Sequence, residues 1–263
     1  MAHVEKYTDE EVSPILRHNS RKIKNNSNKD IDPKLSHLNY SLAPHRRMDP
    51  FIYYKRRKAQ LYCYGRKDVK TLAGFVITLP KEITDPDKQN EFFKAVYDFL
   101  EDRYGKENVI QAQVHYDEGK REKIKNPKTG RYEINSDGSI KTKLIFGQPH
   151  LHFNWIPVVK IDPEKTNRTG SVSGKKFSYH EEMSHYKEKI CAKEVLTKTE
   201  LRKFHTELDK YLKEKGIEGN VINGSTEGKG YTVEQLKKKT ELEMKVKELE
   251  HKIDVIKDRT ITY

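Results

Sequence analysis

Three histidines in two separate segments have the residue types and spacing of a metal site. Residues 147–155 read Gly-Gln-Pro-His-Leu-His-Phe-Asn-Trp, so His150 and His152 alternate with the apolar residues Leu151 and Phe153. Alternate side chains of a strand point to the same face, so the two imidazoles are predicted to lie about 7 Å apart. The pattern therefore predicts a strand with one apolar face and one histidine face.

A third histidine ends another predicted strand. His115 is the next-to-last residue of the predicted strand at residues 108–116, and Asp117 and Glu118 come directly after that segment. If the two histidine strands pair as antiparallel neighbours, three neutral nitrogen ligands meet with open coordination positions left over, which is typical of a catalytic metal site. The alternative is a half-exposed strand with ordinary surface histidines, and the second histidine segment with its carboxylates favours the metal.

A fourth histidine lies near the amino end of the chain, beside an arginine. A helix is predicted to begin with Ser13 as N-cap and Pro14 in the first turn, and to run toward Arg21. His18 and Arg21 are three residues apart and are predicted to share a helical face. An arginine that grips phosphate oxygens next to a histidine that acts at phosphorus suits phosphate chemistry, whereas the alternative is a solvated helix end.

Composition indicates a polyanionic partner. The 263 residues suffice for one large domain, or for one domain with an appendage. The formal net charge is +12 and charged residues make up 35% of the chain, which favours nucleic acid first and an anionic membrane surface second. The 15 tyrosines suit stacking on unpaired bases better than adhesion to lipid.

Cysteine content and hydropathy indicate the compartment. Cys63 and Cys191 are far apart in sequence, so no disulfide framework is predicted and a reducing cytoplasm is favoured. The longest apolar run, residues 72–79, is far too short to span a bilayer, and residues 1–7 contain no run of signal-peptide length. We therefore expect a cytoplasmic protein whose present segment makes no membrane contact.

Periodicity predicts the elements that position these residues. Strands are predicted at residues 2–7 and 72–79, and helices from Pro86 to Gly105 and from Thr197 to Gly216. The remaining segment, residues 120–147, contains the turn signals Asn-Pro-Lys-Thr-Gly and Ser-Asp-Gly. It is predicted to be a lysine-rich hairpin inserted between the two histidine strands.

The chain is predicted to divide near residue 220. Residues 1–220 hold the predicted strands and the four candidate site histidines described above. A linker rich in glycine and asparagine follows. Residues 231–263 carry apolar residues at alternating spacings of four and three, over two heptads. Two heptads are too few for a stable coiled coil, so this helix is predicted to dock on a surface or to begin a longer dimer segment.

Four motifs, taken in order, resemble the plasmid mobilisation relaxases of the Mob/Pre (MobV-type) family. They are His18-Asn19-Ser20-Arg21, Asn28-Lys29-Asp30-Ile31-Asp32-Pro33 with Ser36-His37-Leu38-Asn39-Tyr40, His115-Tyr116-Asp117-Glu118, and Pro149-His150-Leu151-His152. The resemblance covers roughly residues 1–220, and the ordered set is far more specific than any single motif.

The resemblance implies a fold and an activity. The implied fold is the α+β fold of HUH endonucleases, a central antiparallel sheet with flanking helices, here with an inserted hairpin and C-terminal helices. The implied activity is metal-dependent, site- and strand-specific nicking of plasmid DNA at an origin of transfer, in single-stranded or hairpin form, for conjugative mobilisation. In this family the histidine of the His-Asn-x-Arg motif, here His18, is the nucleophile where other relaxases use tyrosine.

The sequence departs from the family pattern at one connection. The usual short Glu-x-Thr-Pro-His-x-His connection is interrupted by the inserted hairpin, and Gln148 stands where threonine is common. An insertion that displaced Glu118 would remove its role, whereas the three histidines could keep theirs.

The implied mechanism gives each of these side chains a role. A divalent cation would be held by His115, His150 and His152. Mn²⁺ is favoured over Mg²⁺ because the ligands are nitrogens, and no nucleotide cofactor is expected. His18 would attack the scissile phosphate and form a covalent 5′ link that conserves the energy of the broken bond.

Carboxylates and arginines are expected to support that attack. Glu118, or Asp117 in its place, would accept a hydrogen bond from the second ring nitrogen of His18. Arg21 and Arg66 would hold phosphates of the DNA.

Three alternatives remain open at this stage. Tyr7 and Tyr40 are rival nucleophiles because both lie near the predicted site in sequence. A rolling-circle replication initiator would share the fold and the chemistry and differ in the origin that it nicks. A basic DNA-binding module with a structural metal would cleave nothing.

Overall fold

The computed structural model describes most of the first 221 residues. The described residues are 2–22, 30–43, 48–127, 129–162, 170–172, 175–177, 183, 185–221 and 242. The chain divides into two units, residues 1–222 and 223–263. The helix predicted for residues 231–263, with its docking or dimer contact, falls outside the described residues apart from Leu242.

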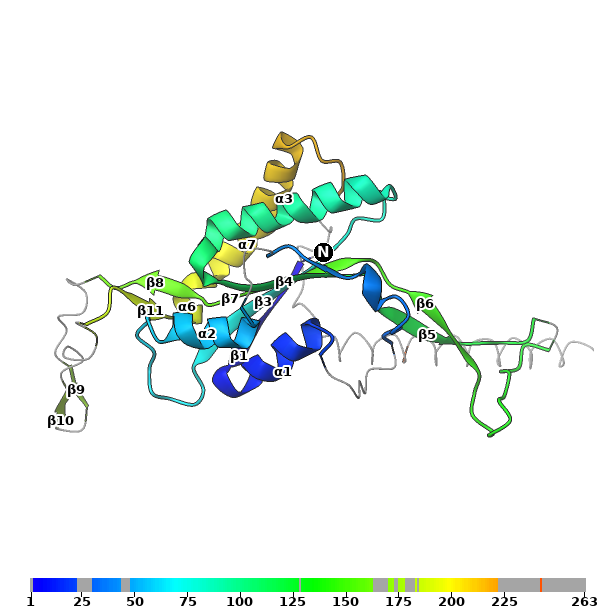
Figure 1. Ribbon diagram of the computed structural model, residues 1–263, viewed down its shortest axis with the longest axis horizontal. Coiled ribbons are helices and arrows are strands. Elements are labelled where there is room, and N and C mark those ends of the chain that lie inside the picture. The colour runs from blue at the N-terminus through cyan, green and yellow to red at the C-terminus, as the bar shows by residue number, and fades with distance from the viewer. Residues whose placement is uncertain are drawn as a thin grey trace, which may run out of the picture. The chain divides into compact units, whose positions relative to one another are not determined.

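A five-stranded antiparallel sheet forms the centre of the first unit (Figure 1). Its strands, in spatial order, are β1 (Ala2–Thr8), β3 (Lys70–Thr78), β7 (His150–Trp155), β4 (Val109–His115) and β2 (Tyr40–Ser41). Every neighbouring pair runs antiparallel. With the helices described next, this sheet confirms the expected α+β class.

Helices cover both faces of the sheet. Figure 1 shows α3 (Pro86–Tyr104) and α7 (Lys198–Glu214) on one face, and α1 (Asp9–Asn19) and α2 (Pro50–Lys58) on the other. Three shorter helical segments connect the strands: η1 (Ser36–Leu38), η2 (Lys106–Asn108) and α6 (Ala192–Val195). Among the described residues, none of the helices combines the length and the apolar content that crossing a membrane requires.

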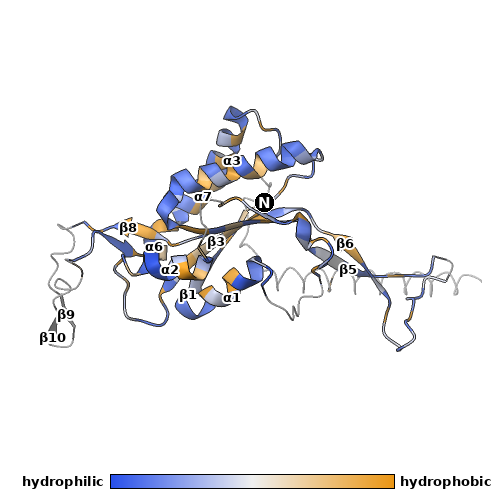
Figure 2. Cartoon of the chain, viewed as in Figure 1, coloured by the Kyte–Doolittle hydropathy of each residue, from blue (hydrophilic) through white to orange (hydrophobic). Residues whose placement is uncertain are grey.

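The face under α3 and α7 holds the larger hydrophobic cluster. Phe75 of β3 stacks on Trp155 and on Phe204 of α7, with ring centroids 5.0 and 4.4 Å apart. Figure 2 shows hydrophobic residues on the side of α3 that faces the sheet and hydrophilic ones on its outer side. Because side chains alternate along a strand, the residues between these apolar ones face α1.

The predicted start of the first helix was wrong. Helix α1 begins at Asp9 rather than after Ser13, because Thr8 and Glu11 form a capping box. The Glu11 carboxylate accepts hydrogen bonds from the Thr8 backbone N–H at 2.6 Å and from its hydroxyl at 2.9 Å. Pro14 lies inside the helix, at the loss of one backbone donor.

The inserted hairpin is present and leaves the histidine strands paired. Strands β5 (Gly119–Lys123) and β6 (Thr142–Phe146) run antiparallel, and we call residues 119–147 the β5–β6 arm. Two more pairs of short strands complete the described elements: β8 (Val158–Lys160) with β11 (Glu188–Ile190), and β9 (Gly170–Val172) with β10 (Lys175–Phe177).

Candidate active site

The three predicted imidazoles converge on the sheet face that α1 covers. Strands β4 and β7 pair so that His115 lies directly opposite His150. The ring centroid of His115 lies 5.6 Å from that of His150 and 4.7 Å from that of His152. The centroids of His150 and His152 are 4.9 Å apart. Leu151 and Phe153 are fully buried on the opposite face, as the alternation predicted.

Hydrogen bonds to backbone carbonyls fix which ring nitrogens are available. His115 Nε2 lies 2.8 Å from the carbonyl oxygen of Asn19, and a carbonyl can only accept, so Nε2 carries the proton and Nδ1 keeps its lone pair. In the same way, His150 Nδ1 donates to the Gln148 carbonyl at 3.2 Å, so the lone pair of this ring is on Nε2. That atom lies 3.1 Å from His152 Nε2. One nitrogen from each of the three rings therefore lies beside a common space.

Burial disfavours the charged forms of His150 and His152. Burial lowers the pKa of His150, although the nearby Glu118 carboxylate acts against it. Burial lowers the pKa of His152 well below its usual range, and His150 and His115 act in the same direction. A neutral imidazole is the form that binds a metal ion, so the electrostatics of the site suit coordination.

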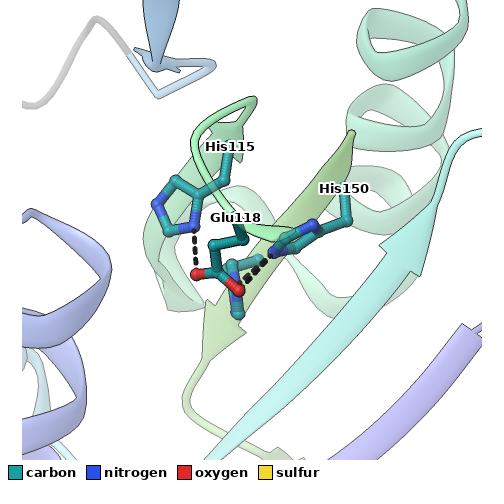
Figure 3. Close-up of side chains that lie close together, drawn as sticks. His115, Glu118 and His150 are labelled. Atoms are coloured by element: carbon teal, nitrogen blue, oxygen red, sulfur yellow. Dashed lines mark hydrogen bonds and ion pairs between the residues drawn. The ribbon is translucent and has the colours of Figure 1, made fainter. Parts of the chain in front are cut away.

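Glu118 lies between His115 and His150 despite the insertion that follows it (Figure 3). Its carboxylate oxygens lie 3.4 Å from His115 Nδ1 and 3.5 Å from His150 Nε2. One ligand atom from each of Glu118, His115, His150 and His152 lies within 4.8 Å of the others, a separation that a single divalent ion can bridge. The donor set consists of three imidazole nitrogens and one carboxylate. It suits Mn²⁺, Zn²⁺ or a similar transition-metal ion better than it suits Mg²⁺, which prefers oxygen ligands.

The charge of Glu118 is stabilised by its neighbours. Burial by itself raises the pKa of the carboxyl, but its interactions with His115, His150 and Arg21 bring it well below its usual range. Among the described side chains, Glu118 contacts His115, His150 and Arg21, and no hydrogen bond joins it to His18. The hydrogen bond expected between Glu118 and His18 is therefore not made in this state.

Arg21 does not share a helical face with His18, which corrects the expectation drawn from their spacing. Helix α1 ends at Asn19, and Arg21 has a φ of 54°, the left-handed conformation. Among the described residues it is the one non-glycine residue with positive φ, a conformation that costs about 1 kcal/mol. This turn directs the guanidinium toward the end of β4.

The Arg21 guanidinium is held there by two carboxylates. Nε and Nη2 donate to the two oxygens of Asp117, at 2.9 and 2.6 Å, and Nη2 also donates to Glu118 at 2.6 Å. Arg21 Nη2 lies 3.0 Å from His115 Nδ1 as well, on the side where that ring offers its lone pair. The arginine predicted to grip a phosphate thus joins the end of α1 to the segment that follows β4.

Asp117 is the site residue that the sequence indicated least. It is fully buried, and the Ser36 hydroxyl donates to its Oδ2 at 2.6 Å. Burial alone raises the pKa of Asp117, but the hydrogen bonds from Arg21 and Ser36 lower it overall. Ser36 belongs to the second motif of the resemblance, so that motif was the available signal for this contact.

His18 lies at the same end of α1, half-buried. Burial lowers the pKa of His18 and the positive charge of Arg21 acts in the same direction, while Glu118 and Asp117 oppose them. The ring is therefore neutral near pH 7, with an unprotonated nitrogen, and it lies within electrostatic reach of the two carboxylates.

The rival tyrosines engage other partners. The Tyr7 hydroxyl donates to Glu5 at 2.6 Å, and burial together with that carboxylate raises the pKa of Tyr7. The Tyr40 hydroxyl donates to Asn90 of α3 at 2.9 Å, and burial likewise raises the pKa of Tyr40. A tyrosine with a raised pKa is a poorer nucleophile, because it gives up its proton less readily.

Arg66 is placed outside this cluster. It lies in the segment before β3 with a side chain 73% exposed, and Asp68 is its ion-pair partner at 3.3 Å. Among the described residues, no hydrogen bond or ion pair joins Arg66 to the histidines or to Glu118.

Two buried amides that hold α1 over the sheet were not predicted from the sequence. Gln111 of β4 donates to the Leu16 carbonyl at 3.1 Å and to the Ser20 hydroxyl at 2.6 Å. Asn154 of β7 lies opposite Gln111, and its amide donates to Gln111 at 3.5 Å. Both are in phase with the histidines of their strands, so period-two alternation was the signal that could have found them.

The fold and the side chains together define an α+β protein with a group of three histidines and a glutamate that could hold a metal ion on one face of an antiparallel sheet. The family model described as plasmid recombination enzyme, Mob_Pre, matches residues 1–238. The chain belongs to this family, which confirms the resemblance drawn from its motifs.

Similar proteins support the same assignment. A plasmid recombination enzyme of Bacillus sp is 30% identical over 222 residues, covering 79% of this chain and 51% of the relative. Another, from Lactiplantibacillus plantarum, is 27% identical over 244 residues, covering 90% of this chain and 52% of the relative. The chain thus spans about half the length of the curated relatives that it matches.

A solved structure shares the fold. The MobM relaxase domain (MOBV; Mob_Pre), bound to oriT DNA of plasmid pMV158 in a Mn-bound crystal structure, aligns with a TM-score of 0.60 at 22% identity. The alignment covers 90% of this chain and 97% of that domain.

Proposed function

We propose that residues 1–220 nick one strand of plasmid DNA at an origin of transfer, by transesterification onto His18. The observation that carries this proposal is the convergence of three imidazoles and Glu118 on one space, with His18 at the end of the helix above it. The MobM relaxase domain, which shares the fold, binds plasmid oriT DNA and manganese in its crystal structure. The net charge of +12 suits a DNA substrate.

The metal ligands are His115 Nδ1, His150 Nε2 and His152 Nε2, with Glu118 as a fourth donor. A divalent cation bound there supplies positive charge to the non-bridging oxygens of a phosphate and opens its phosphorus to attack. Mg²⁺ is disfavoured because imidazole nitrogens dominate the donor set and Mg²⁺ favours oxygen, and Mn²⁺ is preferred because the MobM relaxase domain is Mn-bound in its crystal structure. The reaction needs no nucleotide cofactor, since the phosphorus–nitrogen bond keeps the energy of the bond that it replaces.

His18 is the nucleophile. Its unprotonated ring nitrogen attacks phosphorus, the bond from phosphorus to the 3′ oxygen breaks, and the electron pair leaves with that oxygen. The proton of the second ring nitrogen is then lost to solvent, and the 3′ oxygen gains one, so the products are a 5′-phosphoramidate and a 3′-hydroxyl. Glu118 and Asp117 stabilise the positive charge that develops on the ring, since both already raise its proton affinity.

Arg21 positions the carboxylates and adds positive charge beside the phosphate. Its contacts with Asp117 and Glu118 fix the end of α1 against β4. We propose Arg66, which is exposed, as a phosphate contact farther along the DNA.

A nicking assay on supercoiled plasmid tests this function. The DNA adjoining the gene for this chain is cloned into a vector, and the empty vector is the control. Wild type with Mn²⁺ should relax only the plasmid with the insert, and chelation should stop it. His18→Ala should nick nothing, whereas Tyr7→Phe should nick at the wild-type rate. Nicking by His18→Ala, or intact plasmid with wild type and Mn²⁺, would refute the proposal.

A further inference from the structure

The β5–β6 arm continues well beyond its two strands. The Ile124 N–H donates to the Lys141 carbonyl at 2.9 Å, and the Lys141 N–H donates to the Glu133 carbonyl at 2.8 Å. Isolated bridges join Lys125 to Tyr132 and Ile134 to Ile140. Figure 1 shows the arm projecting from the end of the central sheet, with its tip away from the helices. The ribbon is two-stranded near its base, and beyond it the chain forms two turns, closed by hydrogen bonds from Asn126 to Arg131 and from Asn135 to Ser139, each at 2.8 Å.

Such a ribbon exposes apolar side chains. Four of the large hydrophobic residues exposed in the described chain belong to the arm: Ile134 (67%), Ile140 (39%), Ile145 (38%) and Phe146 (48%). A two-stranded ribbon is marginally stable in water by itself, and exposed apolar residues on such an element indicate a partner.

The charge of the arm indicates what that partner is. Its sequence contains eight lysines and arginines against three acidic residues. Lys123 and Lys125 both lie over the ring of Tyr132, at 5.4 and 5.1 Å, so the two ammonium groups are held side by side. Lys143 and Arg131 are exposed as well. A basic ribbon with fixed ammonium groups is complementary to a polyanion, and not to a neutral protein surface.

The shape of the arm favours a duplex over a single strand. The major groove of B-form DNA, about 12 Å wide, admits a two-stranded β-ribbon. Residues 119–125 extend about 20 Å at about 3.3 Å per residue, which matches roughly six base pairs. Stacked unpaired bases require open aromatic faces, and the Tyr132 ring is already covered by lysines.

The base of the arm adjoins the metal ligands. Glu118 directly precedes Gly119, and the Gly147 N–H donates to the Glu118 carbonyl at 2.9 Å. A Cβ on Gly119 would lie 2.5 Å from the Ile145 carbonyl oxygen, so the two strands approach too closely there for any other residue. DNA bound along the arm would therefore lead into the space between the histidines.

We propose that the β5–β6 arm binds double-stranded DNA, such as the stem of a hairpin, beside the phosphate that is to be nicked. This rests on the proposed function in one respect, because it takes the substrate of the neighbouring histidines to be DNA. Lys123, Lys125 and Lys143 contact the phosphates of the duplex, and the arm thereby sets the distance from the stem to the nick.

Fluorescence anisotropy with two probes tests the arm. The probes are a short blunt duplex of mixed sequence and one of its strands alone, each titrated with the full chain at several salt concentrations. The test variant is Lys123→Gln/Lys125→Gln/Lys143→Gln, and the matched control is Lys198→Gln/Lys203→Gln/Lys210→Gln on α7, which removes the same charge from exposed positions elsewhere.

The arm variant should bind the duplex about 10- to 100-fold more weakly than wild type, while single-strand binding should change little. Its slope of log affinity against log salt should be shallower by about 0.9 for each lysine removed. The control variant should resemble wild type. Equal losses in the arm and control variants, or a wild-type affinity for duplex in the arm variant, would overturn the proposal.

Two further measurements separate the remaining outcomes. Wild type that binds duplex through the arm but fails the nicking assay would refute the proposed function and leave the arm proposal intact. If the arm variant binds duplex as well as wild type does, and wild type nicks the plasmid, the arm proposal is refuted and the proposed function stands. Self-association of wild type that Ile134→Ser/Ile140→Ser abolishes, without an effect of the lysines on DNA, would make the arm an interface between copies and refute its role in DNA binding.

Discussion

The two faces of the central sheet are built from the same strands but do different work. Toward α3 and α7, β3 and β7 present Phe75 and Trp155, which stack on each other and contribute to stability by burial. Toward α1, β4 and β7 present histidines and amides, of which His115 and Gln111 are almost fully buried. Alternation along each strand thus separates the residues that stabilise the fold from those that can do chemistry.

Buried polar groups make the second face demanding. Each needs a partner, and His115 finds the Asn19 carbonyl while Gln111 finds Leu16 and Ser20. The side chain of Asn19 is the exception there, since it is 2% exposed and its amide has no hydrogen-bond partner among the described residues. We therefore expect substitutions on the face toward α1 to remove activity, and substitutions on the face toward α3 and α7 to reduce stability.

The largest effect is expected on the histidine face. His150→Ala should reduce the nicking rate about 10⁴-fold, because it removes a metal ligand from a group that acts as a unit. The melting temperature without metal should change little, since no apolar core is lost. The control is His3→Ala, an exposed histidine on β1. The comparison fails if His150→Ala unfolds the chain, or nicks as fast as His3→Ala.

The opposite face should show the reverse pattern. Phe204→Ala removes a ring that stacks on Phe75 and should lower the free energy of unfolding by about 3–5 kcal/mol. Urea denaturation measures this loss. Below the melting transition, the nicking rate per folded molecule should equal that of wild type, and a selective loss of nicking would contradict the separation of the faces.

A third substitution tests Asp117, a residue beside the site that should also contribute to stability. Asp117→Ala leaves the Arg21 guanidinium without its bidentate partner in a buried place, so unfolding should become easier by about 3 kcal/mol although Asp117 lies beside the site. Asp68→Ala removes the partner of the exposed Arg66 and should cost less than about 0.5 kcal/mol. Equal costs in urea denaturation would show that burial of the Arg21 pair has no energetic importance.

The smallest effect concerns the clamp between α3 and α7. Arg103 donates to both oxygens of Glu200, at 2.6 and 3.0 Å. Burial by itself raises the pKa of Glu200, but the hydrogen bonds and charge of Arg103 lower it below its usual range. The unfolded chain therefore holds the proton more tightly, so the clamp stabilises the fold above a pH of about 4.3 and loses that effect as pH falls through the lowered pKa.

Glu200→Gln should accordingly cost about 1 kcal/mol at neutral pH and progressively less in acid. Denaturation of both proteins at several pH values gives this difference. A cost that stays constant into acid would mean that the ion pair contributes nothing, and nicking at neutral pH should be the same in both.

Local patterns predicted much of this architecture, and tertiary contacts decided the rest. Alternation placed His150 and His152 on one face, and the same rule applied to Gln111 and Asn154 would have found the supports of α1. The pattern at Ser13 and Pro14 predicts the wrong start for α1, because the Thr8 capping box begins the helix earlier.

The position of Arg21 could not be read from spacing. Its left-handed φ is maintained by contacts with Asp117 and Glu118, which are nearly a hundred residues away in sequence. The insertion after Glu118 left the carboxylate in place because β5 starts directly beyond it and pairs with β6, so that the two ends of the arm stay together.

The position of the covalent link to DNA is the most direct test of His18 as the nucleophile. Wild type is incubated with Mn²⁺ and the single-stranded form of the cloned origin, the adduct is digested, and the modified peptide is sequenced by mass spectrometry. The assignment of His18 as nucleophile predicts a 5′-phosphoramidate on that residue, which is hydrolysed by mild acid and is absent after chelation of the metal. An acid-stable link on Tyr7 or Tyr40, or an adduct that forms equally well without metal, would contradict it.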